Sequence, residues 1–93
     1  MGTEVHSLRE HVDPDVQMRE LIQHVACGLV DHPDQVQINE IRGATTTVYE
    51  LTVSQQDVGK LIGRGGRTLR AFRTLVSAVS TKLERKTILE VIE

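Results

Sequence analysis

The chain has 93 residues, enough for one small domain with a single core, and 39% of them are hydrophobic. Its net charge is −2. The single cysteine, Cys27, excludes an internal disulfide framework and fits a reducing cytoplasm. No apolar run has the length or position of a transmembrane helix or a signal peptide. The two aromatic residues, Tyr49 and Phe72, are too few for modules that stack bases on aromatic platforms.

The chain starts with a stretch that shows no periodicity, and a helix follows it. Residues 1–12 are expected to be a flexible extension, and residues 13–93 one domain. Asp13 is a typical N-cap and Pro14 a typical first helical residue, while residues 31–34 end the helix. One apolar face is predicted from spacings of three and four: Met18, Leu21, Ile22, Val25, Ala26 and Leu29.

Alternating apolar residues predict two strands next. Residues 36–41 and 46–53 have strand composition, and residues 42–45, with a glycine, form a turn between them. The two strands are expected to form a hairpin. A third strand is predicted at residues 87–92, where the chain closes the domain.

Two helices separated by a glycine turn are predicted between the second and third strands. Ser54 and Asp57 have the spacing of an N-terminal cap, so Asp57 is interpreted as a cap for a short helix over residues 58–62. That helix ends at the Gly63–Gly66 turn. A longer helix begins at Arg67, with one apolar stripe: Leu69, Phe72, Val76, Val79 and Leu83.

The glycine turn is the most informative feature of the chain. Residues 62–69 read Ile-Gly-Arg-Gly-Gly-Arg-Thr-Leu, a Gly-x-x-Gly turn at the start of a helix. Glycines expose backbone N–H groups without hindrance from a Cβ, and such groups attract anions at a helix N-terminus. Arg64 and Arg67 add full positive charges. A run of phosphates is therefore the expected ligand.

The charge of the chain is distributed unevenly around this turn. Residues 1–50 contain three Arg or Lys against nine Asp or Glu, whereas residues 51–93 contain eight against four. Residues 58–73 include five basic side chains and no acidic one: Lys60, Arg64, Arg67, Arg70 and Arg73. This asymmetry favours a directed contact with an anionic partner over a merely solvated helix face.

Several of these features also have simpler explanations. The glycines could serve only a tight helix–helix turn, although that does not explain the neighbouring arginines. Cys27 is expected to be a core or boundary residue. No metal site is expected, because the histidine spacings match no zinc signature, and solvated side chains are predicted for His6, His11, His24 and His32.

At this point the sequence resembles a K-homology (KH) RNA-binding domain, in the motif at residues 58–69 and in element order over residues 14–93. The leading helix and strand before a β-α-α-β core are similar to the type II arrangement, and the length is similar to the small bacterial KH proteins of the KhpA family. The resemblance implies an α+β fold of order α-β-β-α-α-β, with a three-stranded sheet and helices packed on one face. It also implies a cytoplasmic protein that acts as an RNA chaperone or post-transcriptional regulator.

The resemblance also assigns roles to residues. The Gly63–Gly66 turn would clamp about four nucleotides of single-stranded RNA by their sugar-phosphate backbone. An aliphatic groove would hold the bases, with an apolar wall from the strand near Leu51. The other RNA-binding residues expected are Arg67, Lys60, Ile62, Leu69 and Arg70 within this motif, with Arg64 in the turn itself.

The partners expected besides RNA are protein chains. The last strand is apolar on both faces, with Leu89 and Val91 on one and Ile88 and Ile92 on the other, so its second face is predicted to be an interface. We expect a homodimer, or a heterodimer with a second KH protein, and no membrane partner. The alternative function is a protein-interaction adaptor that does not bind RNA.

Enzyme activity is not expected, and neither is a cofactor. The turn lacks the Gly-x-x-x-x-Gly-Lys-Ser/Thr pattern of nucleotide triphosphatases, and no catalytic residue is predicted.

Overall fold

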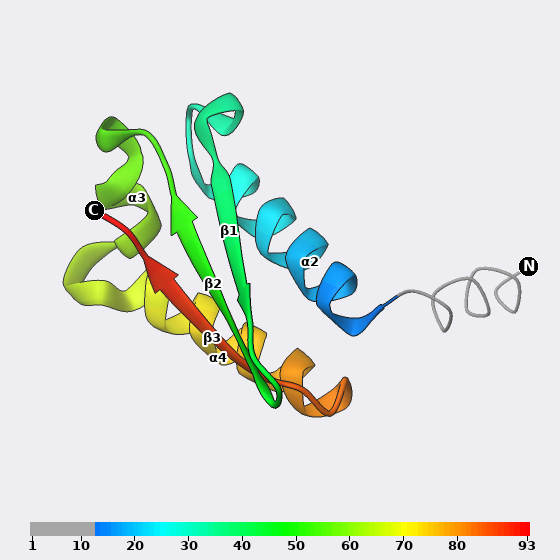
Figure 1. The fold of residues 1–93 in the computed structure, drawn as a ribbon. Helices are drawn as coiled ribbons and strands as arrows, with labels where there is room; N and C mark the ends of the chain where they lie inside the picture. The colour runs from blue at the N-terminus through cyan, green and yellow to red at the C-terminus, as the bar shows by residue number, and fades with distance from the viewer. Residues whose placement is uncertain (1–12) are drawn as a thin grey trace, which may run out of the picture.

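A computed structural model describes residues 13–93 of the chain, which fold as one α+β unit (Figure 1). The predicted extension at residues 1–12 lies outside the described residues, as do His6 and His11. The regular elements follow the predicted order: α2 (Pro14–Leu29), β1 (Gln37–Arg42), β2 (Thr46–Thr52), α3 (Val58–Ile62), α4 (Arg67–Lys82) and β3 (Lys86–Val91). Short 3₁₀ turns precede β1, α3 and α4: Pro33–Gln35, Gln55–Asp57 and Arg64–Gly66.

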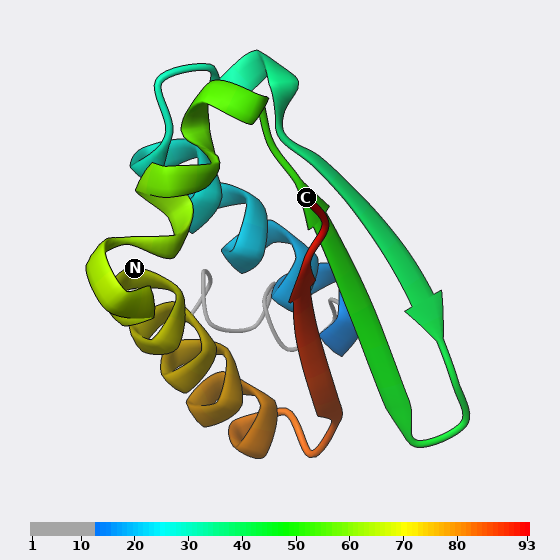
Figure 2. The ribbon, with the colours of Figure 1, turned by 90° about the vertical axis from the view of Figure 1, so that its left-hand side faces the viewer.

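The three strands form one mixed sheet in the order β1-β2-β3. The predicted hairpin is confirmed, because β1 pairs with β2 antiparallel, whereas β2 and β3 are parallel. The two helices α3 and α4 therefore make the crossover that parallel strands require. The helices α2, α3 and α4 lie on one face of the sheet, as predicted, and no helix within residues 13–93 covers the other face (Figure 2).

The α2 helix begins as its sequence predicts. The Asp13 side chain accepts a hydrogen bond from the Asp15 backbone N–H at 2.8 Å, and Pro14 occupies the first turn. The predicted apolar face points at the sheet, where Met18, Ile22 and Ala26 are buried.

One aliphatic core lies between the helices and the sheet. Complete burial of a large aliphatic or aromatic side chain contributes about 1.5–3 kcal/mol to the stability of the fold. The core residues therefore supply most of the favourable free energy of folding. Tyr49 is the largest fully buried side chain. The core consists of Met18, Ile22, Ala26, Val30, Tyr49, Leu51, Val53, Leu61, Phe72, Val76 and Leu89.

A buried polar cluster ties α2 to the sheet at the end where β3 begins. The Asp15 side chain lies 2.7 Å from Nε of Arg42 and 3.3 Å from an NH2 nitrogen of Arg85, and it accepts a hydrogen bond from the Thr47 hydroxyl. Tyr49 donates its hydroxyl to the Asp15 carbonyl at 2.8 Å, and burial raises the pKa of that phenol. These contacts fix the start of α2 against the hairpin.

The uncovered face of the sheet carries a row of aliphatic side chains. Ile41 is paired with Val48, and Val48 is paired with Ile88, so the three lie side by side across all the strands. Ile41 is 50% exposed and Ile88 is 39% exposed. No helix in the described part of the chain is long and apolar enough to cross a membrane.

Candidate nucleic-acid interface

The glycine turn between α3 and α4 adopts a backbone that requires glycine. Gly63, Gly65 and Gly66 all have positive φ, at 77°, 63° and 79°. A Cβ on Gly63 would lie 2.3 Å from Oγ1 of Thr68, closer than two atoms can approach. At Gly65 a Cβ would meet nothing within 4 Å, so this residue faces open space. The turn therefore presents a bare backbone at its tip.

Two unpartnered cations flank this backbone. Arg64 is exposed in the turn, and Arg67 is exposed as the first residue of α4. Neither guanidinium has a hydrogen bond or an ion pair with residues 13–93. The N-terminus of the 16-residue α4 also carries partial positive charge. Together these groups make a local site for anions.

Arg70 braces the turn from the first part of α4. One of its NH2 nitrogens donates to the Gly65 carbonyl at 3.0 Å. This contact joins residues five positions apart, so Arg70 lies against the turn and part of its hydrogen-bonding capacity is used to hold the loop. Its predicted role as an RNA contact stays a prediction.

Lys60 is directed toward the segment after α2. Its ammonium forms an ion pair with Asp31, which raises the pKa of the lysine. Since Lys60 is exposed, the pair lies on the surface beside the turn. Its predicted role as an RNA contact therefore requires it to exchange Asp31 for a phosphate.

The interpretation of Asp57 as a helix cap is wrong. No capping hydrogen bond runs from its side chain to α3, and Oδ2 instead accepts from the backbone N–H and from Nδ1 of His32, each at 2.9 Å. Burial of Asp57 favours the neutral acid, but the hydrogen bonds from His32 outweigh it, so the pKa of Asp57 is lowered. His32 is therefore a half-buried partner and not the solvated side chain that was expected, whereas His24 is exposed.

The apolar wall of the expected groove is not formed near Leu51. Leu51 is fully buried in the core and cannot touch a ligand. The strand that lies along α4 is β3, where Nε of Arg73 donates to the Leu89 carbonyl at 3.1 Å. A hollow of about 220 Å³ lies there, lined by Arg73, Val76, Thr87, Ile88 and Leu89. The right-handed crossover between parallel strands was the signal in the sequence that could have placed β3 here.

The remaining predicted residues flank the turn. Ile62 ends α3 and Leu69 lies in the first turn of α4, and both are half-buried. Leu69 packs against the core, and part of its side chain stays exposed next to the turn.

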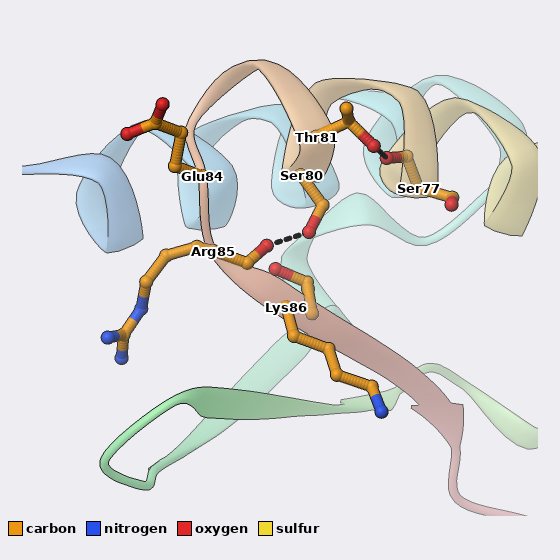
Figure 3. A pocket seen from close by; sticks show the side chains of 7 residues that line it. Ser77, Ser80, Thr81, Glu84, Arg85 and Lys86 are labelled. Atoms are coloured by element: carbon orange, nitrogen blue, oxygen red, sulfur yellow. Dashed lines mark hydrogen bonds between the residues drawn. The ribbon is translucent and has the colours of Figure 1, made fainter.

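A second hollow of about 400 Å³ lies at the other end of α4, at its turn into β3 (Figure 3). Figure 3 shows the Ser77 and Thr81 side chains on α4 and Ser80 directed at the Arg85 carbonyl, to which it donates a hydrogen bond. The hollow is lined by Ser77, Ser80, Thr81, Glu84, Arg85, Lys86 and Thr87.

The His, Cys, Asp and Glu side chains were also compared with the requirements of a metal site. Within residues 13–93, no group of three or more His, Cys, Asp and Glu side chains lies close enough together to hold an ion. Cys27 is half-buried, and its thiol contacts the Pro33 carbonyl at 3.9 Å.

The element order, the parallel β2–β3 pair and the Gly-x-x-Gly turn between α3 and α4 define a KH domain of the type II arrangement. The family model that describes the KH domain of KhpA and KhpB matches residues 19–91 of this chain. The chain therefore belongs to the KhpA/KhpB KH-domain family.

Curated relatives agree with this assignment along most of their length. An RNA-binding protein KhpA from Borreliella burgdorferi is 49% identical over 74 residues, which are 80% of this chain and 90% of the relative. Those from Caldanaerobacter subterraneus and Chlamydia muridarum are 45% and 42% identical, over 81% and 82% of this chain and 100% and 97% of their own. No solved structure matched the chain.

Proposed function

We propose that this protein binds single-stranded RNA and that the Gly63–Gly66 turn clamps its sugar-phosphate backbone. The observation that carries the proposal is the turn itself. Its three glycines have positive φ, and the guanidinium groups of Arg64 and Arg67 have no partner within residues 13–93. Phosphates match both the N–H groups and the charges. The similar KhpA proteins, each named RNA-binding, support a polynucleotide as the anion.

The bases would lie along α4 and β3. The hollow beside the Arg73 side chain offers aliphatic surface from Val76, Ile88 and Leu89, and bases gain free energy by burying their faces on such surface without an aromatic partner. We further propose that Lys60, Ile62, Leu69 and Arg70 border the path of the RNA. A role as an RNA chaperone or post-transcriptional regulator in the cytoplasm extends this proposal, and no catalytic step belongs to it.

The test changes the charge of the turn at constant shape. Arg64→Asp with Gly65→Asp places two carboxylates where phosphates would bind, and Arg64→Asn with Gly65→Asn is the matched control of the same size. Both side chains tolerate the left-handed backbone at Gly65, where φ is 63°. Fluorescence anisotropy with a labelled eight-nucleotide RNA measures Kd, and circular dichroism checks the fold.

We expect the Asp pair to weaken RNA binding at least ten-fold more than the Asn pair, since like charges repel phosphate in addition to the lost contacts. The clamp assignment is wrong if the Asp pair is folded and binds RNA as tightly as the unmodified protein.

We also propose that the uncovered sheet face joins two copies of this chain. A two-fold axis along the row Ile41, Val48 and Ile88 would stack each aliphatic side chain on its own copy, as in an isologous interface. On β3 the same face carries Lys86 and Glu90 on either side of Ile88. That axis brings Lys86 opposite Glu90 of the partner subunit, so the surface is complementary to itself in charge.

Light scattering at tens of micromolar tests this interface. The unmodified chain should have the mass of a dimer, and Ile41→Glu, at a half-exposed position far from the glycine turn, should have the mass of a folded monomer. A strict monomer for the unmodified chain contradicts the dimer. If that monomer binds RNA only together with a second KH protein, the partner is heterologous, and if it binds no RNA at all, the adaptor function is the remaining alternative.

A further inference from the structure

The helix that leads into the glycine turn is too short to be stable by itself. α3 has five residues, and isolated helices of that length do not persist in water, so tertiary contacts decide where it lies. Leu61 anchors its middle in the core. At its end the backbone N–H of Gly63 donates to the Gly59 carbonyl at 2.8 Å, so α3 and the turn are one continuous unit. The contacts at the start of α3 therefore help to place the turn.

A histidine from a distant segment holds the start of α3. Asp57, the residue before α3, is fully buried, and His32 follows α2 in the chain. The backbone N–H and the ring Nδ1 of His32 each lie 2.9 Å from Oδ2 of Asp57. The other oxygen, Oδ1, has no hydrogen-bond partner within residues 13–93. His32 therefore provides much of the compensation for a buried carboxylate, and a buried charge that loses its partner destabilises the fold around it.

The strength of this contact depends on the charge of His32. Burial raises the pKa of Asp57, but the hydrogen bonds from His32 and from the Asp31 backbone outweigh it and lower the pKa, so the carboxylate is ionised at neutral pH. A protonated His32 adds a positive charge beside it, whereas a neutral His32 keeps a hydrogen bond alone. The His32 side chain is 38% exposed and can exchange protons with water. Histidine is the side chain that changes its charge between about pH 5 and 8.

The pH range of the effect follows from these two groups. The ion pair is present while His32 is protonated and is lost as the pH rises through the titration of His32. At the acid end it is lost only when Asp57 takes up a proton, which happens below the ordinary range of an aspartate because the pKa of Asp57 is lowered.

The other charged or titratable side chains around the pair keep their charge over this range. Lysine, aspartate and cysteine side chains ordinarily titrate outside the range from about pH 5.5 to 7.5. A change at the start of α3 within this range is therefore expected to come from His32. These side chains are Lys60 on α3, Asp31 and Asp34 in the segment after α2, and Cys27 on α2.

We propose that His32 is a positioning residue for the RNA clamp: its protonated ring holds Asp57 and the start of α3, and so favours the arrangement of the Gly63–Gly66 turn that binds RNA. This inference rests on the proposed RNA binding. It predicts that RNA affinity rises as the pH falls from about 7.5 to 5.5.

The test measures the Kd of a labelled eight-nucleotide RNA over this pH range at constant ionic strength. His32→Asn keeps a hydrogen-bond donor near the position of Nδ1 but cannot be charged. Asp57→Asn removes the buried charge at nearly constant shape and leaves His32 to titrate. His24→Asn is the matched control, because His24 is exposed on α2 and its side chain has no hydrogen bond or ion pair within residues 13–93. Circular dichroism checks the fold of each variant.

We expect the gain in affinity at low pH to be about two- to five-fold larger in the unmodified protein and in His24→Asn than in His32→Asn and Asp57→Asn. A gain that persists in a folded Asp57→Asn overturns the positioning role, because the charge of His32 would then act on the RNA directly. Equal pH dependence in all four proteins also overturns it, while the clamp stands.

A second measurement needs neither RNA nor a variant. In an NMR titration of the unmodified protein, the amide signals of Gly65 and Gly66 should shift with the same midpoint as the ring signals of His32. Turn amides that do not follow His32 overturn the proposal. If the unmodified protein binds no RNA at any pH, the clamp fails, and this titration alone decides whether His32 positions the turn.

Discussion

The regions at the two ends of α4 both contain arginines, but within residues 13–93 only those at the N-terminal end are without an ion-pair partner. At the N-terminal end, Arg64 and Arg67 are exposed, and their guanidinium groups have no partner within residues 13–93. Beyond the C-terminal end, Arg85 lies against Asp15 and donates to the Thr47 hydroxyl at 2.9 Å. The arginines at one end are thus available to a ligand, and the arginine at the other is part of the fold. The partners of a charge, more than the number of charges, locate a binding site.

The largest effect that would sharpen this contrast is on the backbone of the turn. Gly63 has φ 77° and ψ 172°, a region that only glycine populates, and its Cβ would collide with Thr68. Gly63→Ala is therefore expected to lower the free energy of unfolding by about 3 kcal/mol. Gly65→Ala, the matched control, enters open space in the left-handed region and should cost about 1 kcal/mol. Urea unfolding measures both, and equal losses would show that the turn is not shaped by Gly63.

The second largest effect is expected on stability, at the buried Asp15 that pairs with Arg85 beyond the C-terminal end of α4. Asp15→Asn keeps the shape of the buried side chain but removes the charge that Arg85 and Arg42 face. We expect a loss of about 1.5–3 kcal/mol in the free energy of unfolding with little change in RNA affinity. Asp34→Asn, at an exposed position, is the control. A folded Asp15→Asn protein that has lost RNA binding would break the comparison, because the paired end would then take part in binding.

The smallest expected effect is on RNA affinity and comes from Lys60, which lies on α3 before the glycine turn. Asp31 holds Lys60 in an exposed ion pair, and such pairs are weak because solvent and salt screen them. Asp31→Asn should release the lysine and tighten RNA binding by about two- to five-fold. Asp34→Asn removes the same charge from the same segment without a contact to Lys60, and it should have a smaller effect. Equal gains from the two variants would mean that only net charge matters.

Local signals in the sequence were sufficient for the elements but not for the contacts between them. The Asp13 cap, the apolar face of α2 and the glycine turn each depend on residues a few positions apart, and the structure confirms them. The bonds from His32 to Asp57 and from Arg85 to Asp15 join residues 25 and 70 positions apart. No local pattern encodes such pairs.

The predicted position of the groove's apolar wall, near Leu51, was wrong for the same reason. Leu51 has the alternation of a strand residue, but alternation alone does not say which face of β2 the helices cover. The strand at the edge beside α4 follows from the crossover and not from alternation. The crossover places β3 there, so Leu89 and Ile88 line the hollow and Leu51 lies in the core.

The salt dependence of RNA binding tests the central claim most directly. If Arg64 and Arg67 each contact a phosphate, the plot of log affinity against log salt concentration should become shallower by about 1.4 in Arg64→Gln with Arg67→Gln, since each phosphate contact to a single strand contributes about 0.7. Weaker binding with an unchanged slope would contradict the account, because the two arginines would then act without neutralising phosphates.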